Sequence, residues 1–201
     1  MLLRLCLIAS LTASAASAAS FDDPDWPCIQ RKVPNLSIGQ MWAGPLVDAK
    51  IEALADDADI KNLSTRIALR RTKLEEAEVL VSEFSDAQTS DQNEKLTALF
   101  FAAFEKINHD RSAIVAGIGR YAHKQQALTE QIDTRRSEIH DLNAAAEPDF
   151  DKIEELEDQL TWDTRIFEDR RQSLTYVCET PVILEQRAFA LGRMIMEHLT
   201  D

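Results

Sequence analysis

Residues 91–146 read DQNEKLTALFFAAFEKINHDRSAIVAGIGRYAHKQQALTEQIDTRRSEIHDLNAAA, and no proline interrupts them. Mainly apolar side chains recur there at alternating spacings of four and three residues, from Leu96 to Leu142. Such spacing places the side chains on one stripe of a helix, as at the a and d positions of a heptad repeat. Asp91 followed by Glu94 is typical of a helix start. The stretch therefore predicts one helix, about 80 Å long at 1.5 Å per residue, that needs helical neighbours to cover its stripe.

The same spacing recurs on both sides of this helix. It predicts helices over residues 60–88, 150–178 and 181–199, because Pro148 and Pro181 separate the apolar rows. A shorter helix is expected from Pro45 to Ala55. With only five glycines, six prolines and 6% aromatic residues, the composition is also typical of long helices. The sequence therefore predicts an all-α protein built from long antiparallel coiled-coil helices.

The relative helix lengths predict how the helices are laid out. Helix 60–88 matches the first half of the long helix, and helix 150–178 matches the second half. We therefore expect a three-helix bundle of residues 60–88, 91–118 and 181–199, from which a two-helix arm, residues 119–178, protrudes. Residues 46–201 then form one helical domain.

The first 19 residues have the features of a secretory signal peptide. Residues 1–5 contain one charged residue, Arg4, and an apolar run from Leu2 to Leu11 leads into a stretch of small residues. Cleavage is expected after Ala18 or Ala19. A retained membrane anchor is the alternative, but the run is shorter than the roughly 20 residues that span a bilayer. The protein is therefore expected to be periplasmic or secreted, with no membrane span after processing.

Residues 20–45 differ in composition from the rest of the chain. They contain four of the six prolines, which block regular helix, and both Trp26 and Trp42. Large aromatic residues are rare in disordered segments. We expect an irregular N-terminal segment that packs on the helices. The alternative is that it docks on another protein, which makes Trp26 and Trp42 candidate partner contacts.

Two cysteines, Cys28 and Cys178, remain after signal removal. An even number in an oxidising compartment predicts a disulfide, and two free thiols are the alternative. Since Cys178 falls near the middle of the long helix in the expected layout, the bond would tie the N-terminal segment to the junction of bundle and arm. Gly117 and Gly119 fall at the same level, where they predict either a close backbone approach or a hinge.

The charge of the chain excludes some partners. The full chain has 35 acidic and 22 basic residues. Removal of the signal peptide takes away Arg4 and no acidic residue, so the processed chain has 21 basic residues and a formal charge of −14. Nucleic acid and anionic lipid repel such a protein. The four histidines do not pair at helical spacing and the two cysteines are far apart, so we expect no metal site, no cofactor and no catalytic residues.

Polar residues within the apolar rows predict the register of the helices. In the antiparallel arrangement Asp110 is expected to face Arg70, and Arg135 to face Asp163.

Protein–protein interaction is the function that this pattern favours. Trp162 and Ile166 are large apolar residues off the main row of helix 150–178, which makes them further candidate contacts for a partner or for self-association. The chain is therefore expected to be a periplasmic scaffold or interaction protein without catalytic activity. The alternative is a holdase-type chaperone that grips unfolded clients with helical arms.

Overall fold

The computed structural model describes residues 23–200. The predicted signal peptide, residues 1–19, lies outside the described residues, as do Ser20, Phe21 and Asp22 of the predicted N-terminal segment. Within 23–200 all regular structure is helical, in six helices, so the all-α prediction is confirmed.

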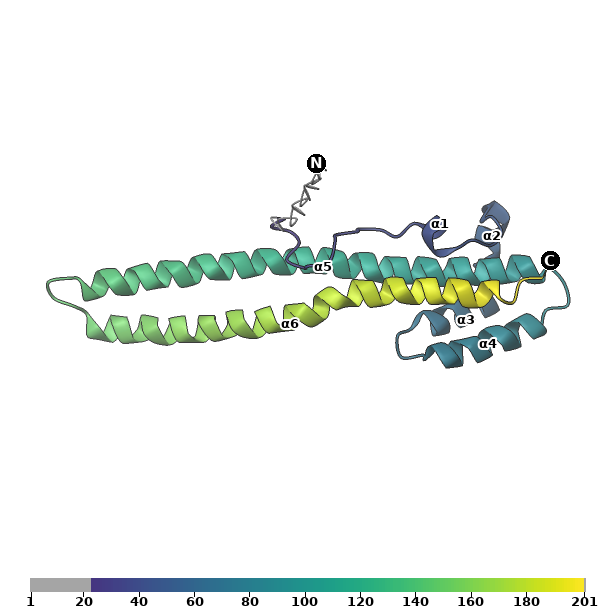
Figure 1. The fold of residues 1–201 in the computed structure, drawn as a ribbon. Coiled ribbons are helices and arrows are strands. Elements are labelled where there is room, and N and C mark those ends of the chain that lie inside the picture. Colours follow the sequence, from purple (N-terminus) through teal and green to yellow (C-terminus); the bar gives the residue numbers. More distant parts are fainter. Residues whose placement is uncertain (1–22, 201) are drawn as a thin grey trace, which may run out of the picture.

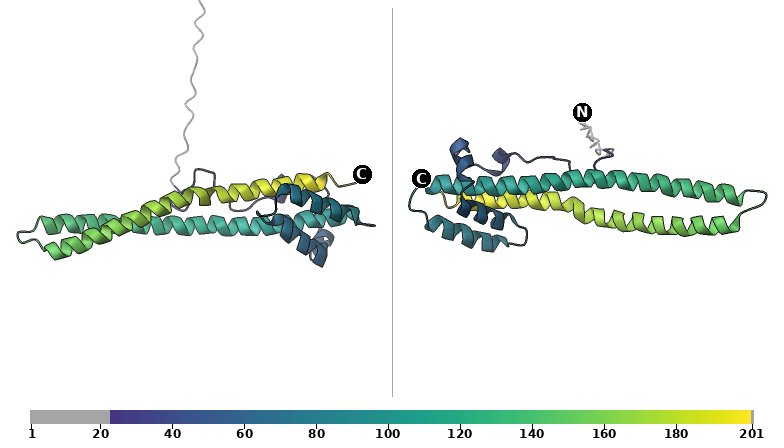
Figure 2. Two further views of the ribbon diagram at one scale, coloured as in Figure 1. Left: turned by 90° about the horizontal axis from the view of Figure 1, so that it is seen from below. Right: turned by 180° about the vertical axis from the view of Figure 1, so that it is seen from behind.

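Two long helices dominate the molecule. Helix α5 spans Gln92–Asn143 and helix α6 spans Phe150–Met196, and a short turn joins them into a hairpin. Helix α6 packs along α5, and the left view of Figure 2 shows it crossing over α5 near the middle of the molecule (Figures 1 and 2). The Asp149 side chain caps α6 by accepting a hydrogen bond from the Lys152 backbone N–H at 3.1 Å. The uninterrupted helix expected over 91–146 is thus confirmed.

Helix α6 runs through Pro181, so the predicted break there is wrong. A proline within a helix removes one backbone hydrogen bond and crowds the preceding turn. The Thr180 hydroxyl donates to the Tyr176 carbonyl at 3.3 Å, and the Pro181 carbonyl accepts from Arg111 Nε at 3.2 Å. Beyond the proline, Leu184, Ala188, Leu191 and Ile195 are all buried against the bundle. The burial of these side chains offsets the cost of the proline, and Figure 1 shows that α6 bends as it enters the bundle.

The predicted helix 60–88 is in fact two helices, which corrects the three-helix bundle. Helix α3 spans Ala58–Ala68 and helix α4 spans Leu74–Asp86. Leu69 is extended, and the Thr72 hydroxyl donates to the Arg66 carbonyl at 2.8 Å. The bundle therefore has four helical segments: α3, α4, the first half of α5 and the end of α6 (Figure 2).

The described part of the N-terminal segment, residues 23–45, runs along α5 from the middle of the molecule to the far end of the bundle (Figure 1). It contains the short helix α1, Ile38–Met41, and leads into α2, Ala49–Leu54. Helix α2 begins four residues later than predicted, because the Asp48 side chain caps it by accepting from the Lys50 and Ile51 N–H groups at 3.0 Å.

Two of the helical glycines lie at close backbone approaches. A Cβ at Gly192 would overlap the Met41 carbonyl oxygen, and a Cβ at Gly119 would lie 3.2 Å from the Asp25 carbonyl oxygen. The predicted close approach is therefore found at Gly119, and the N-terminal segment provides it. At Gly117 the nearest atom is 3.7 Å away, on the flexible Arg120 side chain.

We predict opposite effects for alanine at Gly192 and at Gly117. Gly192→Ala forces Met41 and the end of α1 away from α6, so it should lower the free energy of unfolding by about 1–3 kcal/mol. Gly117→Ala has room and gains helix propensity, so it should raise that free energy by up to about 1 kcal/mol. Urea unfolding followed by circular dichroism measures both. A Gly192→Ala protein as stable as the parent would contradict the close approach.

Candidate functional site

A disulfide joins the N-terminal segment to the middle of the hairpin. The sulfurs of Cys28 and Cys178 are 1.97 Å apart and their Cα atoms 5.5 Å apart, so the predicted bond is confirmed. Trp26, Val115 and Ile118 pack around the two cysteines in a small buried cluster. We call this region the junction, because the bundle lies on one side of it and the hairpin arm, residues 119–178, on the other.

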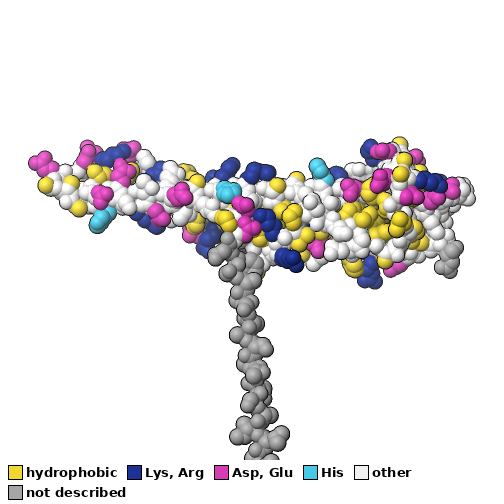
Figure 3. Space-filling view, turned by 90° about the horizontal axis from the view of Figure 1, so that it is seen from above, with side chains coloured by type: hydrophobic (Ala, Val, Ile, Leu, Met, Phe, Trp, Pro, Cys, Tyr) yellow, Lys and Arg dark blue, Asp and Glu magenta, His cyan; other side chains and the backbone are white. Residues whose placement is uncertain are grey.

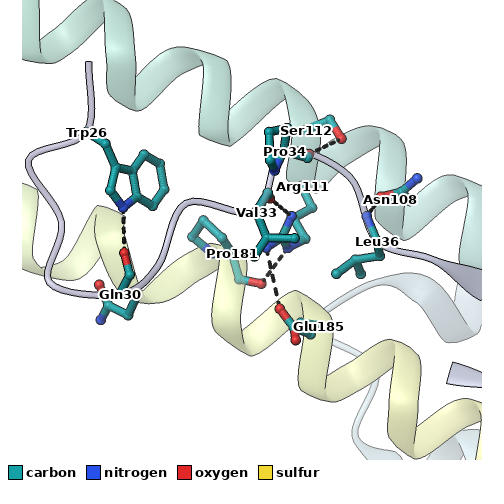
Figure 4. A network of polar contacts seen from close by, with 10 residues as sticks. All are labelled: Trp26, Gln30, Val33, Pro34, Leu36, Asn108, Arg111, Ser112, Pro181 and Glu185. Atoms are coloured by element: carbon teal, nitrogen blue, oxygen red, sulfur yellow. Dashed lines mark hydrogen bonds and ion pairs between the residues drawn. The ribbon is translucent and has the colours of Figure 1, made fainter. Parts of the chain in front are cut away.

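Arg111 ties three segments together beside the junction (Figure 4). Only 3% of this residue is exposed. Its guanidinium donates to the Val33 carbonyl at 2.5 Å and the Pro181 carbonyl at 3.2 Å, and it contacts Glu185 Oε2 at 3.4 Å. Burial lowers the pKa of Arg111, although an arginine remains charged at neutral pH. All three contacts are made within the chain, so Arg111 holds the N-terminal segment and the proline bend of α6 in place.

Hydrogen bonds from α5 hold the rest of this segment. Asn108 Oδ1 accepts from the Leu36 backbone N–H at 2.8 Å, and the Ser112 hydroxyl donates to the Pro34 carbonyl at 3.0 Å (Figure 4). Sequence reasoning missed Arg111, Asn108 and Ser112. The available signal was a cluster of polar residues beside the apolar row, from Asn108 to Ser112.

The four predicted contact residues divide into two groups. Trp26 and Trp42 are buried: the Trp26 indole donates to the Gln30 carbonyl, and the Trp42 ring stacks on Phe100 at a centroid distance of 4.4 Å. They anchor the N-terminal segment, so in this conformation neither ring is presented to a partner. Trp162, by contrast, is 62% exposed on α6, and Ile166 one turn further is half-buried.

The exposed side of α6 carries several large side chains. Tyr176 is as exposed as Trp162, and Thr180 follows at the junction. Fourteen residues separate Trp162 from Tyr176 and eighteen separate it from Thr180. Both intervals are close to whole numbers of helical turns, so the three residues share one side of the helix. We call this side the outer face of α6.

One of the two predicted ion pairs forms across the hairpin. Arg135 and Asp163 pair between α5 and α6, both largely shielded from solvent, and Arg135 Nε also donates to Gln159 Oε1 at 3.2 Å. Asp110 does not pair with Arg70 as expected. It pairs with Lys106, one turn earlier on the same helix.

Two histidines have carboxylate partners rather than only solvent. His123 Nε2 lies 2.6 Å from Asp25 Oδ1, and His198 Nε2 lies 3.0 Å from Glu78 Oε1. Among residues 23–200, no three His, Cys, Asp or Glu side chains come together as metal ligands would. Over the same range, no helix has the length and apolar character needed to cross a membrane.

Comparison with known proteins adds no relative: no family model, curated protein or solved structure matches this chain.

Proposed function

We propose that this chain is an exported, periplasmic scaffold protein that holds a protein partner through the outer face of its hairpin arm and has no catalytic activity. The disulfide between Cys28 and Cys178 fits an exported protein, because such bonds persist in oxidising compartments. The predicted signal peptide, which is short and rich in alanine, supports export to the periplasm.

The exposure of Trp162 carries the proposal. A tryptophan leaves much apolar surface in water when it lies on the outside of a two-helix arm. Large aromatic side chains are enriched at protein interfaces, where they often contribute most of the binding free energy. Acidic and basic side chains alternate elsewhere along the arm, as Figure 3 shows for one of its faces. The outer face of α6 therefore supports a contact with a defined partner.

Site-specific photocrosslinking in intact cells tests this proposal. A photoreactive amino acid replaces Trp162 on the outer face, and a matched variant carries it at Ala127, which is exposed on α5. We expect a discrete adduct from position 162 and little or none from position 127. Absence of any adduct at 162 would contradict the proposal, and a broad set of unfolded outer-membrane clients at both positions would support the chaperone alternative instead.

A further inference from the structure

A basic hollow lies on the bundle side of the junction. It has a volume of about 610 Å³ and opens between the end of α3, the turn that follows α3, the first half of α5 and the proline bend of α6. Its apolar lining includes Ala68, Leu69, Ile114 and Leu184, and its rim carries Arg70, Arg71, Lys106, Asp110 and Thr180.

The charges of the basic hollow are not balanced within the described chain. Lys106 and Asp110 pair with each other. Within residues 23–200, neither Arg70 nor Arg71 forms an ion pair with a carboxylate, and both are exposed. Two unpaired guanidinium groups beside an apolar lining form an unusual surface on a chain of net charge −13. Such a surface fits a ligand that combines an apolar side chain with carboxylates.

The tip of the hairpin arm has the complementary chemistry. Phe150 is 71% exposed there, and Glu147, Asp149 and Asp151 surround it in the sequence. Asp149 caps α6, and none of these three carboxylates forms an ion pair among the described residues. Acidic side chains are visible at the free end of the arm in Figure 3. The tip therefore presents an exposed aromatic ring within a cluster of negative charge.

Helix α6 connects the tip to the basic hollow, and Trp162 lies between them. Asp151 precedes Trp162 by eleven residues, close to three helical turns, and Thr180 on the rim of the hollow follows it by five turns. The outer face thus runs from an acidic end to a basic end. Ile166 lies almost midway, sixteen residues from Phe150 and fourteen from Thr180.

We infer that the partner on this face is a second copy of the same chain, bound antiparallel. The tip of each copy then enters the basic hollow of the other, with Phe150 against the apolar lining and the tip carboxylates beside Arg70 and Arg71. Both contacts form at once around a two-fold axis near Ile166, as in isologous dimers, and the two Trp162 side chains lie close to that axis. This inference rests on the proposed function, because it names the partner of the same face.

The acidic charge of the tip continues into α6. The tip has several carboxylates, and α6 adds Glu154, Glu155, Glu157 and Asp158 in its next two turns. Opposite charges at the two ends of the face also select the antiparallel arrangement, since a parallel pair would place like charges together.

Reciprocal charge reversal tests the inference. The hollow variant is Arg70→Glu/Arg71→Glu, the tip variant is Glu147→Arg/Asp151→Arg, and Arg31→Glu/Arg193→Glu is a control with the charge change of the hollow variant at exposed positions outside the hollow. Sedimentation equilibrium of the processed, oxidised chain should show a dimer with a dissociation constant in the micromolar range, that is, near −8 kcal/mol. Each of the two test variants should dissociate at least tenfold more readily, and the control should behave as the parent.

The decisive result is the mixture of the two test variants. Each copy then meets a partner of opposite charge at both ends, so heterodimers should form at concentrations where each variant alone is largely monomeric. Should a double variant fail to fold, the single substitutions Arg71→Glu and Asp151→Arg provide the same comparison. A parent chain that stays monomeric at about 100 µM, test variants that dimerise normally, or a mixture that stays monomeric would each overturn the inference. A different protein crosslinked at position 162 would then still support the proposed function.

Discussion

Removal of the disulfide should lower the free energy of unfolding by about 5 kcal/mol, the largest effect expected for any change in this chain. Cys28 and Cys178 are 150 residues apart in the sequence. In the chain-entropy model, a crosslink that closes a loop of this length lowers the conformational entropy of the unfolded chain. At about 25 °C this loss raises the free energy of the unfolded chain by about 5 kcal/mol. The double variant Cys28→Ala/Cys178→Ala, unfolded in urea and compared with the oxidised parent, measures the difference.

The same variant should loosen the N-terminal segment more than the bundle. Without the bond, this segment is held to the middle of α5 by the hydrogen bonds to Arg111, Asn108 and Ser112 and by the burial of Trp26. Limited proteolysis should therefore cut near Ile29, which is exposed beside the bond, well before it cuts α5. The parent chain with and without reductant provides the control. A loss of stability below about 1 kcal/mol would show that the bond contributes little beyond these contacts.

The long helices could be predicted because their signal is local. The row of apolar side chains from Leu96 to Leu142 repeats with a helical period, and no proline or turn residue competes with it. The pairing of Arg135 with Asp163 follows from the same rows, since both residues interrupt them and an antiparallel hairpin brings the two positions together. Periodicity therefore predicts both the helices and part of their register.

The shape of the bundle depends on contacts that no local pattern contains. The turn between α3 and α4 leaves the Ile67 and Thr72 carbonyls inside the protein, and the buried Arg187 donates to both, at 2.9 Å and 2.8 Å. Burial lowers the pKa of this arginine, and no carboxylate is among its hydrogen-bond partners. Because Arg187 lies more than 100 residues away in the sequence, the apolar row over 60–88 predicts one helix where the fold has two.

The candidate contacts show a similar limit. Trp26 and Trp42 lie in the proline-rich segment, and Trp162 lies in a predicted helix. The sequence alone does not show which of the three side chains is buried and which is exposed. The first two are covered because the N-terminal segment lies on α5, and the third stays exposed because only α5 accompanies α6 in the arm. Which tryptophan faces solvent is thus decided by tertiary packing.

Phe100→Ala should have the second-largest effect, a loss of about 3–5 kcal/mol in the free energy of unfolding. The Phe100 ring is fully buried on α5, stacks on Trp42 and lies 6.0 Å from the Phe104 ring. One of its ring carbons lies close to Gly192, so the side chain connects the N-terminal segment, α5 and α6. Its removal leaves a cavity between three elements that the neighbouring backbone cannot easily fill. Urea unfolding followed by far-ultraviolet circular dichroism measures the loss.

Phe189→Ala is the matched control for Phe100→Ala, because it deletes the same ring from a site on α6 that is 47% exposed. Much of that ring is already in water, so its removal should cost no more than about 1 kcal/mol. Both variants make the same chemical change, so the difference between their unfolding free energies reports the effect of burial. Loss of the Trp42 stack should also shift the tryptophan emission of Phe100→Ala to longer wavelength, since water then reaches the indole. Equal stabilities of the two variants would mean that Phe100 does not hold the N-terminal segment against the bundle.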